Sequence, residues 1–118
     1  MDRREVGASG EEYAEAYLHN LGYTIRDRNW RCRRGEIDII AEMEGILVFV
    51  EVRSRSTEGR YGTAQESVNR RKQQKVRGIA EYYVHQYRKY EETIRFDVIS
   101  ILFNHGGEPV LEHIKGAF

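Results

Sequence analysis

The sequence has one cysteine, one proline and no long uninterrupted apolar stretch among its 118 residues. Because a single cysteine, Cys32, cannot form an internal disulfide, the chain fits the reducing cytoplasm. No segment approaches the roughly 20 consecutive apolar residues of a membrane helix. The charged residues 1–12 also lack the apolar core of a secretory signal. These absences predict a cytoplasmic protein that does not enter a membrane.

The sequence also has no net charge, since its 19 basic residues balance 19 acidic ones. The charges are nevertheless separated along the chain. Residues 26–34 and 53–77 together hold 13 Lys or Arg against three acidic residues, which leaves the remainder strongly acidic. If the two basic segments meet in space, they form a positive surface suited to nucleic acid, opposite a negative one. Otherwise they are scattered, solvated arginines.

The length indicates one domain, residues 1–118, and the pattern of apolar residues predicts an α/β fold. Gly22 marks the end of a first helix, and Asn69 is suited to cap a second one. The expected order is α-β-β-β-α-β-β, a mixed sheet of about five strands flanked by helices. Helices are expected at residues 3–21 and 69–90, and strands at 23–30, 36–43, 46–53, 93–103 and 110–114.

The second and third strands form a predicted hairpin, because Glu44-Gly45 suits a tight two-residue turn. In that register three aliphatic pairs share one face, and a slip by one residue would set them against charged partners. The pairs are Ile37 with Val52, Ile39 with Val50, and Ala41 with Val48. On the other face the same register sets Asp38 opposite Glu51, and Glu36 opposite Arg53.

Two carboxylates at facing positions repel each other, so the pair Asp38 and Glu51 requires a positive neighbour. One candidate is a divalent cation, and a site with oxygen ligands alone favours Mg²⁺ or Mn²⁺. The other candidate is a guanidinium, from Arg53 or Arg34, in a purely structural ion-pair network. The hairpin by itself leaves both open.

Motifs throughout the chain resemble a known family. The run GEIDIIAEMEGILVFVEVRSR at residues 35–55 resembles the D-xn-E-x-K signature of PD-(D/E)xK nucleases. The whole chain resembles the YraN family of small uncharacterised bacterial proteins, through GxxGExxAxxYL, NWRCRRGEIDIIA, FVEVRSR, NRRKQQKV, RFDVI and HIKGAF. That family in turn is similar to archaeal Holliday-junction resolvases. The resemblance implies a restriction-endonuclease-like fold and a homodimer.

The resemblance also implies catalytic roles for Glu11, Asp38, Glu51 and Arg53, and Lys72 is a further candidate that does not come from the resemblance. Asp38 and Glu51 would bind the Mg²⁺ or Mn²⁺ ion, and Glu11 on the first helix would be a third acidic ligand. Arg53 occupies the position of the nuclease lysine, and Lys72 could take over that role if the second helix begins beside the site. Because arginine stays protonated at any working pH, Arg53 can contact phosphate but is a poor base.

Basic residues around this site are the expected contacts to nucleic acid. Those assigned to DNA are Arg31, Arg33, Arg34, Arg55, Arg70, Arg71 and Lys75. Arginines around Trp30 suit phosphate contacts with base stacking, although Trp30 could equally belong to the core. Residues 54–63 are a candidate flap over the substrate. The tyrosines of the second helix are interpreted as packing residues: Tyr82, Tyr83, Tyr87 and Tyr90.

Together these residues predict a DNA-binding protein that cleaves structured or branched DNA by metal-dependent phosphodiester hydrolysis. Two alternatives stay open. The first is an inactive nucleic-acid-binding module of the same fold, which Arg53 in place of lysine would favour. The second is a protein-interaction domain whose basic face docks an acidic partner. Asp97, inside a predicted strand, is expected to have a structural role.

Overall fold

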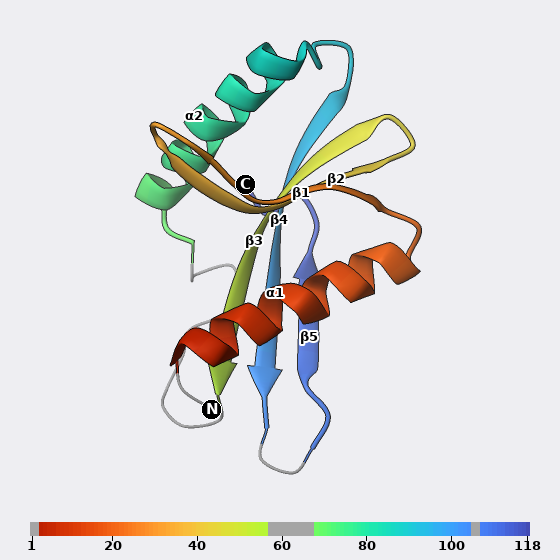
Figure 1. The fold of residues 1–118 in the computed structure, drawn as a ribbon, viewed down its shortest axis with the longest axis vertical. Helices are drawn as coiled ribbons and strands as arrows, with labels where there is room; N and C mark the ends of the chain where they lie inside the picture. Colours follow the sequence, from red (N-terminus) through yellow and green to blue (C-terminus); the bar gives the residue numbers. More distant parts are fainter. Residues whose placement is uncertain (1–2, 57–67, 105–106) are drawn as a thin grey trace.

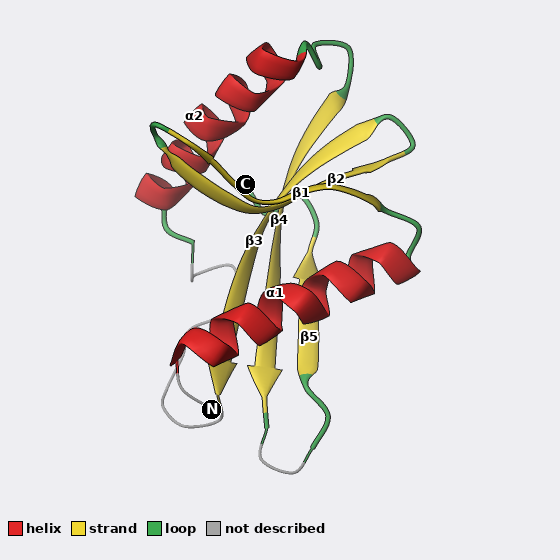
Figure 2. Cartoon of the chain, in the orientation of Figure 1, coloured by secondary structure: helices red, strands yellow, loops and turns green. Residues whose placement is uncertain are grey.

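In the computed structural model, which describes residues 3–56, 68–104 and 107–118, two helices flank one five-stranded sheet (Figures 1 and 2). The elements are α1 (Arg3–Asn20), β1 (Thr24–Cys32), β2 (Gly35–Met43), β3 (Ile46–Ser56), α2 (Arg70–Tyr87), β4 (Thr93–Phe103) and β5 (Val110–Ile114). The predicted α/β class and element order are confirmed. Among the described residues, neither helix is long and apolar enough to cross a membrane.

The strands lie in their sequence order, β1-β2-β3-β4-β5. β3 and β4 are parallel, and α2 provides the crossover between them, whereas every other neighbouring pair is antiparallel. In Figure 1, α1 crosses the face of β3, β4 and β5, and α2 lies on the other side of the sheet beside the curved β1–β2 hairpin. The two helices therefore approach the sheet from opposite faces.

Local signals in the sequence set the ends of several elements as predicted. α1 ends where Gly22 takes a φ of 98°, and the amide of Tyr23 bonds back to the Leu18 carbonyl at 3.0 Å. The β2–β3 turn uses positive φ at both Glu44 and Gly45, as a tight hairpin requires. The Asn69 side chain caps α2 by accepting a hydrogen bond from the Lys72 amide at 2.9 Å.

The core has one layer on each face of the sheet. Under α1, buried side chains of β2, β3 and β4 pack against Ala14 and Leu18. Under α2, another set packs against Ile79 and Tyr83, and this set includes Ile37. The prediction that Ile37 shares the face of Ile39 is therefore wrong: the two side chains enter opposite layers. The regular alternation of β2 is interrupted between them, at Asp38.

Several predicted boundaries and packing positions also differ. α2 ends at Tyr87, three residues earlier than expected, because Arg88 adopts the left-handed conformation with a φ of 53°. Tyr83 is buried, but Tyr82, Tyr87 and Tyr90 are 51%, 45% and 61% exposed, so packing is the wrong interpretation for these three. β3 continues through Ser56, and the remainder of the proposed flap, residues 57–63, lies outside the described residues.

Asp97 is the centre of a buried polar network that joins β4, β5 and α1. Its carboxylate accepts two hydrogen bonds from Arg95 at 2.8 Å, one from His113 at 2.7 Å and one from the Gly116 amide at 3.1 Å. His113 in turn contacts the Tyr17 hydroxyl at 2.9 Å. Burial alone would raise the pKa of Asp97, but the bonds from His113 and Arg95 hold it below its usual value. This geometry supports the predicted structural role.

Gly10 is where α1 comes closest to β3, since a Cβ there would overlap the Ser54 hydroxyl and lie 2.9 Å from the Ser54 Cβ. Gly10→Ala should therefore destabilise the fold by about 1–3 kcal/mol, although alanine is intrinsically better in a helix by about 1 kcal/mol. Gly7, in the same helix, has no atom of the described residues within 4 Å of such a Cβ. Gly7→Ala should leave stability unchanged or raise it.

Urea unfolding of both variants checks this prediction. The double variant Gly10→Ala with Ser54→Gly should regain part of the lost stability, because the overlapping hydroxyl is gone. Equal stability of the two single alanine variants would show that α1 can move away from β3 at no cost.

Candidate functional site

Asp38 and Glu51 come together where β2 and β3 separate. The predicted register is confirmed for the five pairs from Met43↔Ile46 to Ile39↔Val50, where the described pairing stops. Beyond it, the Asp38 carboxylate accepts a hydrogen bond from the Val52 amide at 2.8 Å. Glu36 is bound by Arg31 of β1 at 2.6 Å, and the described β2–β3 pairing does not reach the predicted facing positions of Glu36 and Arg53. The two carboxylates thus lie at a divergence of the strands.

The environment of this pair disfavours two negative charges. Glu51 is 3% exposed, and its Oε1 atom is buried with no hydrogen-bond partner among the described residues. Burial, and then repulsion from Asp38, raise the pKa of Glu51 to about 8. Burial also raises the pKa of Asp38, and the Val52 amide and Lys72 only partly offset it. Both groups therefore hold their protons more tightly than exposed carboxylates do.

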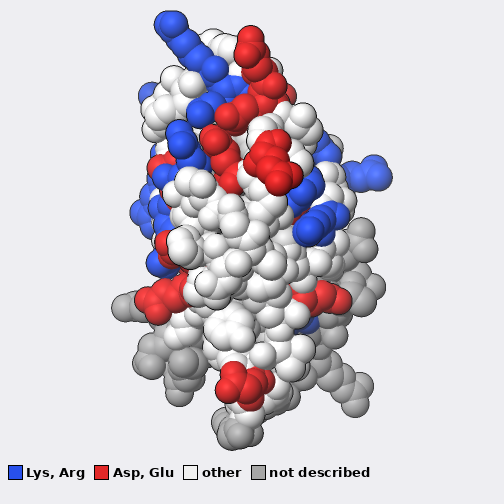
Figure 3. Space-filling view, turned by 90° about the vertical axis from the view of Figure 1, so that its right-hand side faces the viewer, with Lys and Arg blue, Asp and Glu red and all other residues white. Residues whose placement is uncertain are grey.

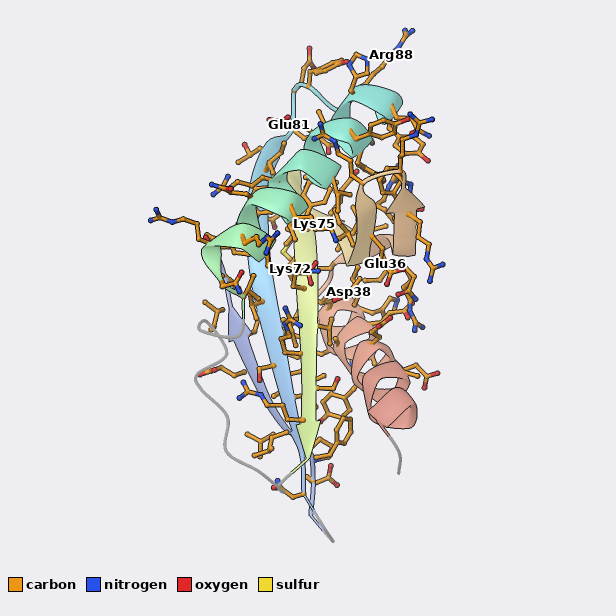
Figure 4. All side chains as sticks on the ribbon, turned by 90° about the vertical axis from the view of Figure 1, so that its left-hand side faces the viewer. Glu36, Asp38, Lys72, Lys75, Glu81 and Arg88 are labelled. Carbon is orange, nitrogen blue, oxygen red and sulfur yellow. The ribbon has the colours of Figure 1, made fainter. Side chains whose placement is uncertain are left out.

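Lys72 supplies a positive charge from the first turn of α2. Its ammonium lies 3.8 Å from Glu51 Oε2, and Figure 4 shows Lys72 beside Asp38 at the edge of this helix. The helix does begin beside the site, which was the condition for Lys72 to act there. Arg53 lies near enough to lower the pKa of Glu51, but its Nε atom is buried and has no hydrogen-bond partner in the part of the chain that the structure describes. Among the described ion pairs, no guanidinium bridges the two carboxylates.

Glu11 reaches the site from the opposite face of the sheet. The close approach of α1 at Gly10 brings the next residue near the strands. Burial and the charge of Asp38 raise the pKa of Glu11, whereas a hydrogen bond from Asn29 and the charge of Arg28 oppose this shift. The Arg28 guanidinium lies 3.9 Å from Glu11 and 2.9 Å from Glu15, so it holds both carboxylates on one side of α1.

Asn29 and Arg28 are functional candidates that the sequence motifs did not single out. Asn29 has a φ of 50° inside β1, a conformation that few residues other than glycine and asparagine adopt, and it contacts Glu11. An asparagine within a run of strand-forming residues was the available signal, because asparagine is depleted in strand interiors. Backbone conformations of this kind gather at functional sites.

The donors present suit a hard divalent cation bound together with a substrate. Within the described residues, no three His, Cys, Asp or Glu side chains form a ready-made metal cage. Mg²⁺ commonly uses one or two carboxylates and completes its shell with waters and substrate phosphates. Asp38 and Glu51, with the unpaired Oε1 atom of Glu51, match that requirement. A cation between them would also relieve their mutual repulsion.

The two basic segments meet where the β1–β2 hairpin packs on α2. A Cβ at Gly35 would lie 2.9 Å from the Lys75 side chain, and one at Gly78 would lie 2.8 Å from a guanidinium nitrogen of Arg34. Residues 31–34 and 70–77 therefore share one region of the surface. The opposite side, in Figure 3, carries both signs in its upper part and few charges in the middle, so it is not the acidic face expected.

The predicted DNA contacts differ in how available they are. Arg33, Arg34, Lys75, Arg70 and Arg71 form no ion pair within the described part of the chain, and all five are exposed. Arg31 is exposed but paired with Glu36. Arg55 is half-buried and donates to the Ser100 hydroxyl at 3.1 Å. Arg55 is thus partly engaged within the protein, whereas the unpaired five are free to meet an anion.

Comparison with known proteins finds similarity over nearly the whole chain. Residues 10–101 match the profile of the Uncharacterised protein family UPF0102. A UPF0102 protein of Desulforamulus reducens is 46% identical over 120 residues, covering 99% of this chain and 98% of the relative. Another, from Rhodococcus opacus, is 43% identical over 113 residues, covering 96% and 95%. A third, from Myxococcus xanthus, is 43% identical over 117 residues, covering 99% and 91%. These descriptions name no activity.

The raised pKa of Glu51 predicts how stability without metal depends on pH. With a folded-state pKa of about 8 against 4.5, folded Glu51 keeps a proton that the unfolded chain releases between those values. The metal-free protein should therefore lose stability as pH rises from about 5 to 8. Glu51→Gln should remove part of this loss, on the order of 1–3 kcal/mol.

Urea unfolding in a chelator, at both pH values, measures the effect. The variant should match the wild type near pH 5 and exceed it near pH 8. If it is less stable at both, Glu51 and Lys72 form a structural ion pair that the fold requires.

Proposed function

This chain belongs to the uncharacterised protein family UPF0102, the YraN family, and we propose that it is a metal-dependent endonuclease that hydrolyses phosphodiester bonds of structured or branched DNA. The observation that carries the proposal is the pair of half-buried Asp38 and buried Glu51, which are destabilised as charges when no cation is bound. Such a pair is unfavourable in a fold selected for stability alone, and perturbed pKa values of this kind gather at catalytic sites.

Each residue of the site has a role that its position permits. Asp38 and Glu51 would hold Mg²⁺ or Mn²⁺, whose chemistry is to lower the pKa of bound water and to neutralise charge on the phosphate. Glu11, whose pKa is raised, is suited to orient a water molecule or accept its proton. Lys72 is suited to hold a phosphate oxygen, since its ammonium already lies 3.8 Å from Glu51.

Although Arg53 occupies the usual lysine position, the site still contains a lysine, Lys72. The ammonium of Lys72 reaches Glu51 from α2, and the charge of Arg53 acts on both Asp38 and Glu51. We propose that the two tasks of the nuclease lysine are divided between these side chains. An inactive binding module is the second candidate function, and the observation that favours it is Arg53 itself, because a guanidinium cannot act as a base.

Partners and location follow from the same proposal. The unpaired cations Arg33, Arg34 and Lys75 would contact the DNA backbone, with Arg70 and Arg71 extending the contact along α2. The proposals of specificity for branched DNA and of a homodimer rest on the resemblance to Holliday-junction resolvases. The proposal of a cytoplasmic location rests on the absence of disulfides. An acidic protein is the remaining alternative partner for the basic surface.

Metal binding is the first test. Mn²⁺ titration should detect binding to the wild type. Asp38→Asn and Glu51→Gln should each weaken it by at least the roughly 10- to 100-fold that loss of an outer-shell partner costs. Glu12→Gln is the matched control, because Glu12 is an exposed acid beside Glu11 on α1. Equal weakening in the control would mean that Mn²⁺ binds to surface charge and not to this pair.

Cleavage is the second test. With Mn²⁺, the wild type should cut at least one member of a labelled panel of duplex, single-stranded, flapped and four-way-junction DNA. Asp38→Asn should abolish cutting, and Lys72→Met should reduce it by about 100-fold or more, in the range of a lost general acid–base or charge-stabilising group. Metal binding without cutting of any substrate would favour the inactive module, and Arg53→Lys would then be tested for a gain of activity.

A further inference from the structure

Two exposed tyrosines and a half-buried tryptophan form a patch on the surface shared by β1 and α2. Trp30 lies against Tyr82 and Tyr87, with ring centroids 6.2 Å and 6.4 Å apart, and its Nε1 atom approaches the Tyr87 hydroxyl at 3.4 Å. Tyr82 is 51% exposed and Tyr87 is 45% exposed. We call Trp30, Tyr82 and Tyr87 the aromatic patch.

Trp30 packs in part against the core under α2, whereas Tyr82 and Tyr87 lie outside that buried cluster. The packing role at this place belongs to Tyr83, which is buried, meets Trp30 edge-on at 5.1 Å and donates its hydroxyl to Asp27 at 2.8 Å. A hollow of about 250 Å³ opens beside Tyr87, lined in part by Arg26 and Lys89. Arg26 and Lys89 are paired with Glu42, whereas Arg34 and Lys75 lie farther along the same surface without an acidic partner among the described residues. Exposed tyrosines beside a half-buried tryptophan, near such cations, are typical of surfaces that stack nucleobases.

The aromatic patch continues the line of cations that begins at the carboxylate site. Lys75 lies about one turn after Lys72 on α2, and Tyr82 lies about two turns after Lys75. Arg34 rests on this helix at Gly78, between Lys75 and Tyr82. At about 1.5 Å per residue, Tyr82 lies roughly 15 Å along the helix axis from Lys72. Figure 4 shows Asp38, Lys72 and Lys75 in this order toward the middle of α2. A strand that leaves the carboxylates along α2 would meet Lys75, then Arg34, then the aromatic patch.

The charges beside the aromatic patch favour an anionic occupant over a second copy of the chain. Arg33, Arg34 and Lys75 have no acidic partner within the described residues. A two-fold dimer through this surface would bring like patches together and place these cations near their own equivalents. The phosphates of a nucleic acid strand would instead neutralise them, while its bases cover the exposed rings.

We propose that the aromatic patch stacks unpaired bases of a DNA strand whose phosphates are held by Lys75 and Arg34. The substrate of the proposed nuclease is therefore DNA with a single-stranded segment adjoining the cleaved phosphate. This second statement rests on the proposed function, whereas base stacking on the aromatic patch does not.

Binding of a single strand without metal tests the stacking. A labelled oligothymidine of roughly 12 nucleotides, within the 4–16 nucleotides typical of single-strand sites, is titrated in a chelator and followed by anisotropy. Tyr82→Ala should weaken binding about 5- to 100-fold, and Tyr82→Phe should stay close to the wild type, since stacking needs the ring and not the hydroxyl. Tyr13→Ala is the control, because Tyr13 is a similarly exposed tyrosine on α1.

Two further readouts identify the contact. Trp30 is the sole tryptophan, so its fluorescence should be quenched when the oligonucleotide binds. Lys75→Gln should reduce the slope of log affinity against log salt by about 0.7, the value for one single-strand phosphate contact, whereas Tyr82→Ala should leave this slope unchanged. Unchanged affinity in Tyr82→Ala, or no change in Trp30 fluorescence on binding, would overturn the proposal.

The outcomes also separate this proposal from the proposed function. Stacking without cleavage would support the proposed role of the aromatic patch and contradict the proposed nuclease activity. If fully paired duplex is cleaved as fast as flapped DNA and Tyr82→Ala does not change the rate, the nuclease proposal is supported. The proposed role of the aromatic patch in binding the substrate is then contradicted. The last experiment is sedimentation of the protein without DNA, which measures its oligomeric state. A dimer that Tyr82→Ala dissociates would assign the patch to self-association and overturn the proposal.

Discussion

Repulsion between the carboxylates of Asp38 and Glu51 is the constraint around which the site is arranged. Both are largely removed from water, and the pKa of each is raised because burial disfavours its charge. The protein relieves this only in part, through one backbone amide to Asp38 and one lysine ammonium 3.8 Å from Glu51. A buried acceptor, Glu51 Oε1, is left without a hydrogen bond. Unsatisfied groups of this kind cost free energy, and sites that bind ligands are where proteins retain them.

The rest of the architecture brings complementary groups to that point from both faces of the sheet. α1 can lie close to β3 because Gly10 has no side chain, and this brings Glu11 near Asp38. α2 begins at the Asn69 cap, so that its first turn presents Lys72. The same helix then passes under Arg34 and ends beside Trp30. One helix thus joins the carboxylate site, the cations and the aromatic patch, which gives the proposed nuclease a continuous path for a strand.

Much of the fold was predictable because short-range chemistry decides it. The turn at Glu44-Gly45, the end of α1 at Gly22 and the Asn69 cap each depend on a conformation or hydrogen bond within a few residues. The hairpin register followed from matching aliphatic residues across two strands. An error occurred where a distant element decides the packing, since Ile37 turns into the layer under α2.

The sequence alone therefore determined the elements, their order and the proximity of Asp38 to Glu51, since these depend on periodicity and on a turn. Only the tertiary structure decided which groups from distant elements meet that pair. The positions of Glu11, Asn29 and Lys72 depend on how closely each helix packs on a curved sheet. The aromatic patch was hidden for the same reason. Tyr82 and Tyr83 are neighbouring residues of the same type. Packing against Trp30 and Asp27 buries the ring of Tyr83, whereas the ring of Tyr82 stays exposed.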